Sequence, residues 1–205
     1  MSSSAGLTQA RATPNNLPVL RSALVGRTEA LAAAGDLLLR DDVGLLTFTG
    51  PGGVGKTRLA LHLAASLLER FHHGVFFVNL APISDPDLVI STITETLGIK
   101  ESPGQPLIES LKRYLRDRAM LLVLDNFEHV LEAASTVAEL LAASPRLKVL
   151  ATSREVLHLH DEHIFTVPPL DFPDPKHLLS LERLTQYEAV RLFIQRHETR
   201  SPTSR

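Results

Sequence analysis

The chain has 205 residues, of which 44% are hydrophobic and 21% charged, a composition that is typical of a globular protein and excludes disorder of the whole chain. Its formal net charge is −2, so it lacks the excess of lysine and arginine with which dedicated nucleic-acid-binding domains neutralise phosphates, and we expect no direct nucleic-acid binding. The absence of cysteine excludes disulfides, thiol nucleophiles and cysteine-ligated zinc.

The first 16 residues predict a flexible tail. They lack the basic segment followed by an apolar core that defines a secretory signal. No apolar run in the sequence approaches the roughly 18 residues that a membrane-spanning helix needs. We therefore expect a soluble, cytoplasmic protein without membrane contact.

The first predicted elements surround a glycine-rich turn. Residues 31–39 carry Ala and Leu at the density of a helix, and residues 43–49 (VGLLTFT) form a short apolar run typical of a buried strand. Residues 50–55 form the turn, and apolar residues then recur three and four positions apart over residues 56–71, which predicts an amphipathic helix.

The same alternation continues along the chain. The further predicted elements are a strand at 74–81, a helix at 86–97 capped by Asp85 and Gly98, a helix at 106–118, a strand at 120–125, a helix at 128–143, strands at 147–152 and 164–167, and a helix at 184–197. Parallel strands need crossovers long enough to hold a helix, so the pattern predicts an α/β fold with about five mostly parallel strands and helices on both faces. Ligands then bind at the carboxyl ends of the strands.

The glycine-rich turn carries the clearest functional motif. Residues 50–57 (GPGGVGKT) satisfy the pattern GxxxxGK[ST] between a predicted strand and a predicted helix. Glycines allow backbone N–H groups to converge on phosphate oxygens, and the positive end of the following helix favours the same anion. Lys56 would reach the β- and γ-phosphates, and Thr57 would ligate Mg²⁺. The alternative is a glycine loop that only turns the chain.

A candidate metal ligand ends the most apolar strand. Asp125 follows the run Met120–Leu124 and would face Mg²⁺, although an acid at this place can also cap the next helix. Many ATPases have a second acid directly after the first, whereas this chain has Asn126 and then Glu128. Glu128 could reach the attacking water, or it could be an acid favoured by the helix dipole, so the general base stays open.

A cation follows the fourth predicted strand. Arg154 comes after Thr152 and Ser153, at the same sheet edge as the phosphate loop, where a guanidinium could read whether the γ-phosphate is present. The alternative is a solvated surface arginine.

Together these motifs resemble the STAND class of P-loop ATPases, and within it the NB-ARC-like ATPase domain of bacterial LuxR-type and related signal-transducing regulators. The resemblance covers residues 16–197 and includes LVGR at 24–27, GPGGVGKTRLA at 50–60, LLVLDNFEHV at 121–130, LKVLATSRE at 147–155 and VPPL at 167–170. It implies a three-layer P-loop fold with the additional-strand sheet order, in which the strand before Arg154 lies between the other two motif strands.

The resemblance also implies the roles of individual residues. Nucleotide contacts fall on Val25, Gly26, Arg27, Gly50, Gly52, Gly53, Val54, Gly55, Lys56, Thr57, Arg58, Pro169 and Leu170. Catalysis falls on Lys56, Asp125 and Arg154, and Mg²⁺ on Thr57 and Asp125. Glu128 is a further catalytic candidate from its position after Asn126, not from the resemblance. The implied domains are a tail at 1–16, the P-loop domain at 17–170, a linker and first helix of a helical subdomain at 171–198, and a flexible end at 199–205.

The resemblance implies a switch. ATP or ADP with Mg²⁺ would bind, slow hydrolysis would reset the module, and protein partners or self-association would follow activation. Family members continue into a helical subdomain and a winged helix, of which this sequence holds only the start. The second hypothesis is therefore a fragment that holds ADP or binds proteins without turnover. A small-molecule kinase and a GTPase are disfavoured because neither an acceptor motif nor [NT]KxD occurs.

Two remaining clusters have plain interpretations. His158, His160 and His163 could bind a metal, but their spacing defines no ligand geometry and they are expected to be solvated. The basic residues Lys112, Arg113, Arg116 and Arg118 are expected to form a solvated helix face, with partner or nucleic-acid contact as the alternative.

Overall fold

Helices and strands alternate in the computed structural model, which describes residues 13–20, 24–100, 104–170 and 190. The elements are α1 (Thr28–Leu38), β1 (Leu45–Thr49), α2 (Lys56–Ser66), β2 (Val75–Asn79), α3 (Leu88–Thr96), α4 (Leu107–Leu115), β3 (Met120–Asp125), α5 (Ala134–Ala143), β4 (Leu147–Thr152) and β5 (Glu162–Thr166), with short 3₁₀ turns at Leu68–Arg70, Phe127–His129 and Leu131–Ala133. The predicted helix at 184–197 lies outside the described residues apart from Val190.

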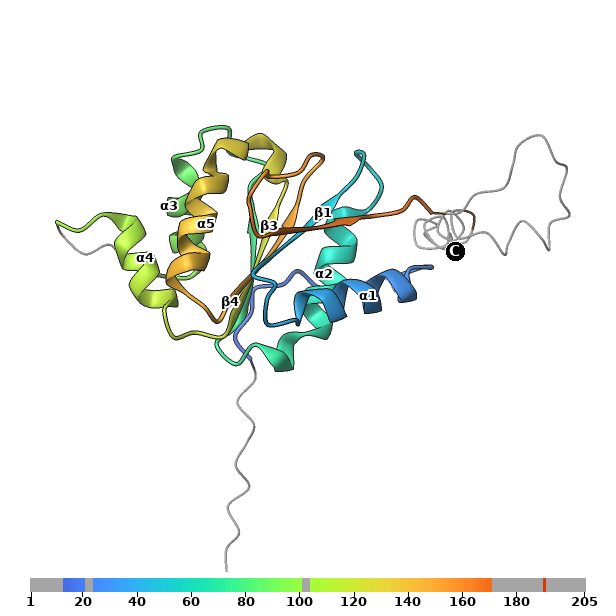
Figure 1. Ribbon diagram of the computed structural model, residues 1–205, viewed down its shortest axis with the longest axis horizontal. Helices are drawn as coiled ribbons and strands as arrows, with labels where there is room; N and C mark the ends of the chain where they lie inside the picture. Colours follow the sequence, from blue (N-terminus) through green and yellow to red (C-terminus); the bar gives the residue numbers. More distant parts are fainter. Residues whose placement is uncertain (1–12, 21–23, 101–103, 171–189, 191–205) are drawn as a thin grey trace, which may run out of the picture.

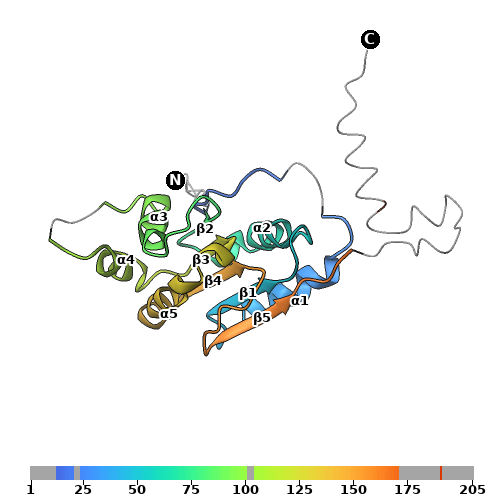
Figure 2. The same ribbon diagram turned by 90° about the horizontal axis from the view of Figure 1, so that it is seen from above.

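The strands of the described residues form one parallel sheet of five strands in the order β2-β3-β4-β1-β5 (Figure 2). This confirms the predicted α/β fold, and β4 lies between β1 and β3 as the resemblance implies. All carboxyl ends therefore meet at one edge of the sheet, which brings the residues after β1, β3 and β4 close together.

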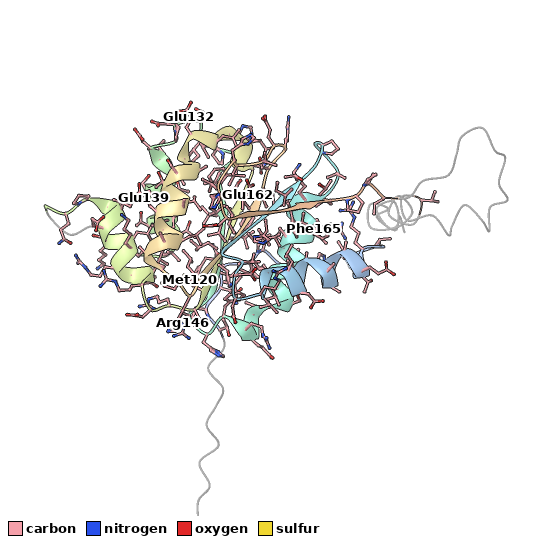
Figure 3. All side chains as sticks on the ribbon, viewed as in Figure 1. Met120, Glu132, Glu139, Arg146, Glu162 and Phe165 are labelled. Carbon is pink, nitrogen blue, oxygen red and sulfur yellow. The ribbon has the colours of Figure 1, made fainter. Side chains whose placement is uncertain are left out.

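Helices cover both faces of the sheet (Figure 1). α1 and α2 lie on one face, and α3, α4 and α5 lie on the other. Each face has its own hydrophobic core, one including Phe48, Leu59 and Leu63 and the other including Ile93, Leu111 and Val137. Met120, at the start of β3, lies between the helical layers and has no exposed surface (Figure 3).

Burial falls from the centre of the sheet to its edges. Every residue of β1 and β3 is buried, and β4 is buried except for Lys148. The edge strands β2 and β5 contain half-buried and exposed residues. Strands covered on both faces need apolar residues at every position, which is why β3 has the sequence MLLVLD.

The segment after β3 differs from the predicted helix at 128–143. Two successive 3₁₀ turns precede α5, which begins only at Ala134. Phe127, Val130 and Ala133 are all buried, and a spacing of three residues keeps side chains on one side of a 3₁₀ helix with three residues per turn. Asn126 adopts the left-handed conformation with φ 63° and separates this segment from β3.

Other predicted boundaries move by a few residues. The helix predicted at 56–71 ends at Ser66 and continues as a 3₁₀ turn, and the helix predicted at 106–118 ends at Leu115. Gly98 ends α3 with φ 65°, as predicted for a C-terminal cap. The Asp85 carboxylate accepts a hydrogen bond from the Asp87 backbone N–H at 3.0 Å and so holds the turn before α3.

Residues 13–16, which the sequence places in a flexible tail, are joined to the edge strand β2. Val75 N–H donates to the Pro14 carbonyl at 3.0 Å, and Asn15 forms a parallel bridge with Val75. The Asn16 side-chain amide then pairs with both backbone groups of Phe77, at 2.8 and 2.6 Å. An amide side chain thereby supplies the hydrogen bonds of a missing neighbour strand and covers an exposed sheet edge.

Replacing Gly74 with alanine is expected to destabilise the fold by about 2 kcal/mol, measured by urea denaturation. Gly74 has φ 121°, and an added Cβ would lie 2.9 Å from the Pro14 carbonyl oxygen and still closer to the Phe76 ring. Gly98→Ala is the matched control because Gly98 also has a positive φ but has open space around it. Equal losses for both variants would contradict the steric explanation.

Among the residues that the structure describes, none of the helices has the length and apolar character that crossing a membrane requires.

Candidate functional site

The glycine-rich loop lies between β1 and α2 at the carboxyl edge of the sheet. Gly53 and Gly55 have φ values of 80° and 96°, which L-residues with a side chain rarely adopt, and these two conformations wind the backbone tightly before α2 begins. Lys56 is the first residue of α2, and its Nζ donates hydrogen bonds to the carbonyl oxygens of Gly50 at 2.7 Å and Pro51 at 3.2 Å. The Lys56 ammonium therefore lies within the loop that the GxxxxGK[ST] motif predicts to bind phosphates.

Lys56 is only 8% exposed, and its ammonium lies among other charges. Burial is the main cause that lowers its pKa, and the charge of Arg154 acts in the same direction. The carboxylates of Glu128 and Asp125 raise the pKa and so oppose both effects. Residues after β3 and after β4 thus influence the ammonium of the loop that follows β1, as expected when the carboxyl ends of parallel strands converge.

Asp125 is a buried carboxylate at the end of β3, with 4% of its surface exposed. Its Oδ1 accepts hydrogen bonds from the Thr57 hydroxyl at 2.7 Å and from the Thr152 hydroxyl at 2.6 Å. A carboxylate and a hydroxyl are oxygen ligands of the kind that Mg²⁺ prefers, so Thr57 and Asp125 fit the predicted metal position. The described part of the chain holds no group of three or more His, Asp or Glu side chains that could bind a metal.

Thr152 is a site residue that the sequence motifs do not single out. It is fully buried at the end of β4, where its hydroxyl donates to Asp125 and accepts from the Asn126 backbone N–H at 3.1 Å. A polar residue at the end of an otherwise apolar strand, beside the strand that ends in Asp125, is the signal that could have pointed to it. Thr152 thereby fixes both the carboxylate and the start of the left-handed turn at Asn126.

Replacing Thr152 with valine, which has the same shape, is expected to cost about 2 kcal/mol of folding stability in urea denaturation. The reason is that the Asn126 N–H loses its acceptor and the Asp125 carboxylate loses one of its two donors. Thr166→Val is the matched control, since Thr166 is exposed and lies 3.4 Å from the Thr49 hydroxyl. A loss for Thr152→Val no larger than that of the control would show that this hydroxyl is dispensable.

Arg154 and Glu128 meet beside the phosphate loop. Arg154 Nε lies 3.1 Å from Glu128 Oε1, and the side chains are 62% and 8% exposed. The guanidinium also lies next to the loop, because a Cβ added at Gly52 would be 3.8 Å from Arg154 Nη2. The structure therefore places Glu128 in the site, on a 3₁₀ turn rather than at the start of an α-helix.

The residues predicted to contact adenosine border two hollows. Leu24, Val25, Arg27 and the loop residues around Gly53 line a cavity of about 130 Å³ together with Arg58 and Leu170. Pro169 lines a neighbouring cleft of about 520 Å³ with Gly26 and Arg27. Arg27 Nη2 donates to the carbonyl oxygens of Val54 at 2.7 Å and Pro168 at 2.8 Å. The guanidinium thus joins the two chain segments that border the small cavity.

The other candidate clusters stay apart from this site. Lys112 pairs with Glu109 at 3.0 Å and with Glu139 at 3.2 Å, Glu139 being labelled on α5 in Figure 3. Arg118 lies 4.0 Å from the centre of the Tyr114 ring. Lys112 is therefore held between α4 and α5, whereas Arg113 and Arg116 are exposed.

Known proteins are similar in sequence to most of this chain. The model of a family described as an AAA domain matches residues 39–165. A Mycobacterium tuberculosis protein named as an HTH-type transcriptional regulator is 41% identical over 153 residues, which are 74% of this chain and 16% of that protein. Regulatory protein AfsR of Streptomyces coelicolor is 29% identical over 185 residues, which cover 82% of this chain and 18% of that protein. The chain thus spans about a sixth of the length of these relatives.

One solved structure gives independent support for the fold. The crystal structure of Cdc6p from Pyrobaculum aerophilum superposes with a TM-score of 0.53 at 20% identity, over 72% of this chain and 42% of that chain. At this identity the similarity concerns the arrangement of helices and strands alone.

Proposed function

The chain belongs to the AAA domain family of P-loop ATPases, and from this premise we propose that it binds ATP and ADP with Mg²⁺ and acts as a slow, nucleotide-driven switch within a signal-transducing regulator of the STAND, NB-ARC-like type. The observation that carries the proposal is the convergence of Lys56, Asp125, Glu128 and Arg154 on one glycine-rich loop.

Each of these residues has a chemical task in the proposed reaction. Backbone N–H groups of the loop and the start of α2 bind phosphate oxygens, and Lys56 exchanges its loop carbonyl partners for the β- and γ-phosphates. Thr57 and Asp125 hold Mg²⁺, which when bound draws charge from the phosphate oxygens. Arg154, whose guanidinium lies beside Gly52 of the loop, reads the γ-phosphate.

The adenosine part of the nucleotide is proposed to occupy the cavity bordered by Val25, Arg27 and Leu170. Its small volume, about 130 Å³, fits part of a purine base, and the lining is mainly aliphatic. Glu128, the carboxylate that pairs with Arg154, is the candidate for the catalytic base.

The regulatory context is proposed from the names of the relatives. The larger proteins are described as regulators, and a module that is about a sixth of such a protein is suited to changing the arrangement of attached domains. We propose that activation brings protein partners or further copies of the chain to this module, in the cytoplasm, without direct contact to nucleic acid. The net charge of −2 favours this last point.

The second candidate is a module that holds ADP or a protein partner without turnover. What favours it is the open face beside the phosphate loop, where Arg154 is 62% exposed and further domains of a longer protein could close the site.

Calorimetric titration of the chain with ADP and with Mg-ATP, followed by phosphate release from the same samples, tests the proposal. Binding of both nucleotides with slow release supports the switch. Binding of ADP without any release favours the second candidate, and the absence of binding contradicts both nucleotide hypotheses.

A further inference from the structure

Glu128 and Arg154 form an ion pair whose two members differ in their freedom to move. Glu128 is 8% exposed, whereas Arg154 is 62% exposed and has a long side chain with many rotamers. The carboxylate is anchored by its backbone, since the adjacent Phe127 is fully buried in the core below β3. A fixed acid therefore holds one end of an otherwise mobile arginine.

The pair uses only part of each group. The contact joins Arg154 Nε to Glu128 Oε1, and Glu128 Oε2 is buried without a hydrogen-bond partner. A guanidinium has five N–H donors in a planar fork, so a bond through Nε leaves the terminal nitrogens available. One of them, Nη2, is the atom nearest to the space above Gly52 in the phosphate loop.

We propose that Glu128 is a positioning residue for Arg154: it holds Nε so that the terminal guanidinium nitrogens face the γ-phosphate position, and it thereby sets the preference of the site for ATP over ADP. The inference rests on the proposed function. Because the ion pair already restricts the rotamers of Arg154, binding of the γ-phosphate costs less side-chain entropy. ADP has no γ-phosphate and gains little from this arrangement.

The test compares two variants that remove the same charge. Glu128→Gln keeps an acceptor oxygen for Arg154 Nε, whereas Glu128→Ala does not. Both variants lack the carboxylate charge, so a difference between them cannot come from the repulsion between this carboxylate and the nucleotide. The readout is the ratio of the Kd for ADP to the Kd for a non-hydrolysable ATP analogue, by calorimetry with Mg²⁺. We expect this ratio to be about fivefold lower in Glu128→Ala than in Glu128→Gln.

The same pair of variants in an Arg154→Gln background completes the test. There the ratio is expected to be equal for alanine and glutamine at position 128, because no guanidinium remains to be positioned. Glu132→Gln, which neutralises an exposed acid four residues further on, is expected to behave as the unmodified chain. Thermal unfolding of each variant is measured to check that the fold is retained.

Three outcomes overturn the inference. Equal ratios for the two Glu128 variants would mean that the ion pair does not position Arg154, and a higher ratio in Glu128→Ala would mean that it restrains Arg154 from the phosphate. Loss of hydrolysis with unchanged binding ratios would assign Glu128 to the attacking water instead. If the unmodified chain bound neither nucleotide, the proposed function itself would be contradicted, whereas ADP binding with equal ratios contradicts the positioning role alone.

Discussion

Lys56→Ala is expected to weaken the binding of ADP and of Mg-ATP by about 100-fold or more, measured by calorimetry. Lys56 is buried, and its ammonium already lies within hydrogen-bond distance of two carbonyl oxygens of the phosphate loop. Removing it leaves a site of backbone donors without their central positive charge, while the nearby Glu128 and Asp125 carboxylates continue to repel phosphate.

The matched control for this variant is Lys100→Ala. Lys100 is exposed and lies away from the loop, at the end of the turn after α3, so the substitution removes the same charge from the chain without touching the site. Similar weakening in both variants would show that net charge, rather than the placement of Lys56, governs binding. Retention of full affinity in Lys56→Ala would remove the basis of the proposed nucleotide site.

Asp125→Asn is expected to lower Mg-dependent phosphate release by about 100-fold or more, while ADP binding in the absence of Mg²⁺ is retained. Asparagine keeps an oxygen acceptor at the position where the Thr57 and Thr152 hydroxyls donate, so the local packing is preserved. It removes the negative charge that Mg²⁺ requires at the end of β3.

Asp117→Asn serves as the control, because Asp117 is an exposed acid between α4 and β3. Release rates are measured over a range of Mg²⁺ concentrations, where a shift of the half-saturating concentration in Asp125→Asn alone supports a metal ligand. A release rate equal to that of the unmodified chain at every Mg²⁺ concentration would exclude Asp125 from this role.

The sequence predicted the elements best where burial on both faces forces one pattern. The bounds of β3 and β4 were predicted to the residue. β3 is a continuous apolar run that ends in Asp125, and β4, apolar apart from Lys148, ends at Thr152 before the polar residues Ser153 and Arg154. Edge strands and helix ends moved by a few residues, because partly exposed positions tolerate polar residues and leave the boundary undefined.

The parts that could not be predicted depend on contacts between distant segments. The 3₁₀ turns after β3 place apolar residues at a spacing that a helix also satisfies, so only packing decides between them. The role of Thr152 depends on its hydrogen bond to Asp125, which is 27 residues away in the sequence. The Asn16 side chain likewise pairs with Phe77, which is 61 residues away. No local pattern encodes such distances.

The bridge made by Arg27 has a mechanical consequence. Its guanidinium ties Val54 in the phosphate loop to Pro168, which is 141 residues further along the chain than Arg27 itself. The segment that leads into α1 and the segment that leaves β5 therefore meet at the same loop. We therefore expect a displacement of either segment to shift the loop, because one guanidinium is hydrogen-bonded to both Val54 and Pro168.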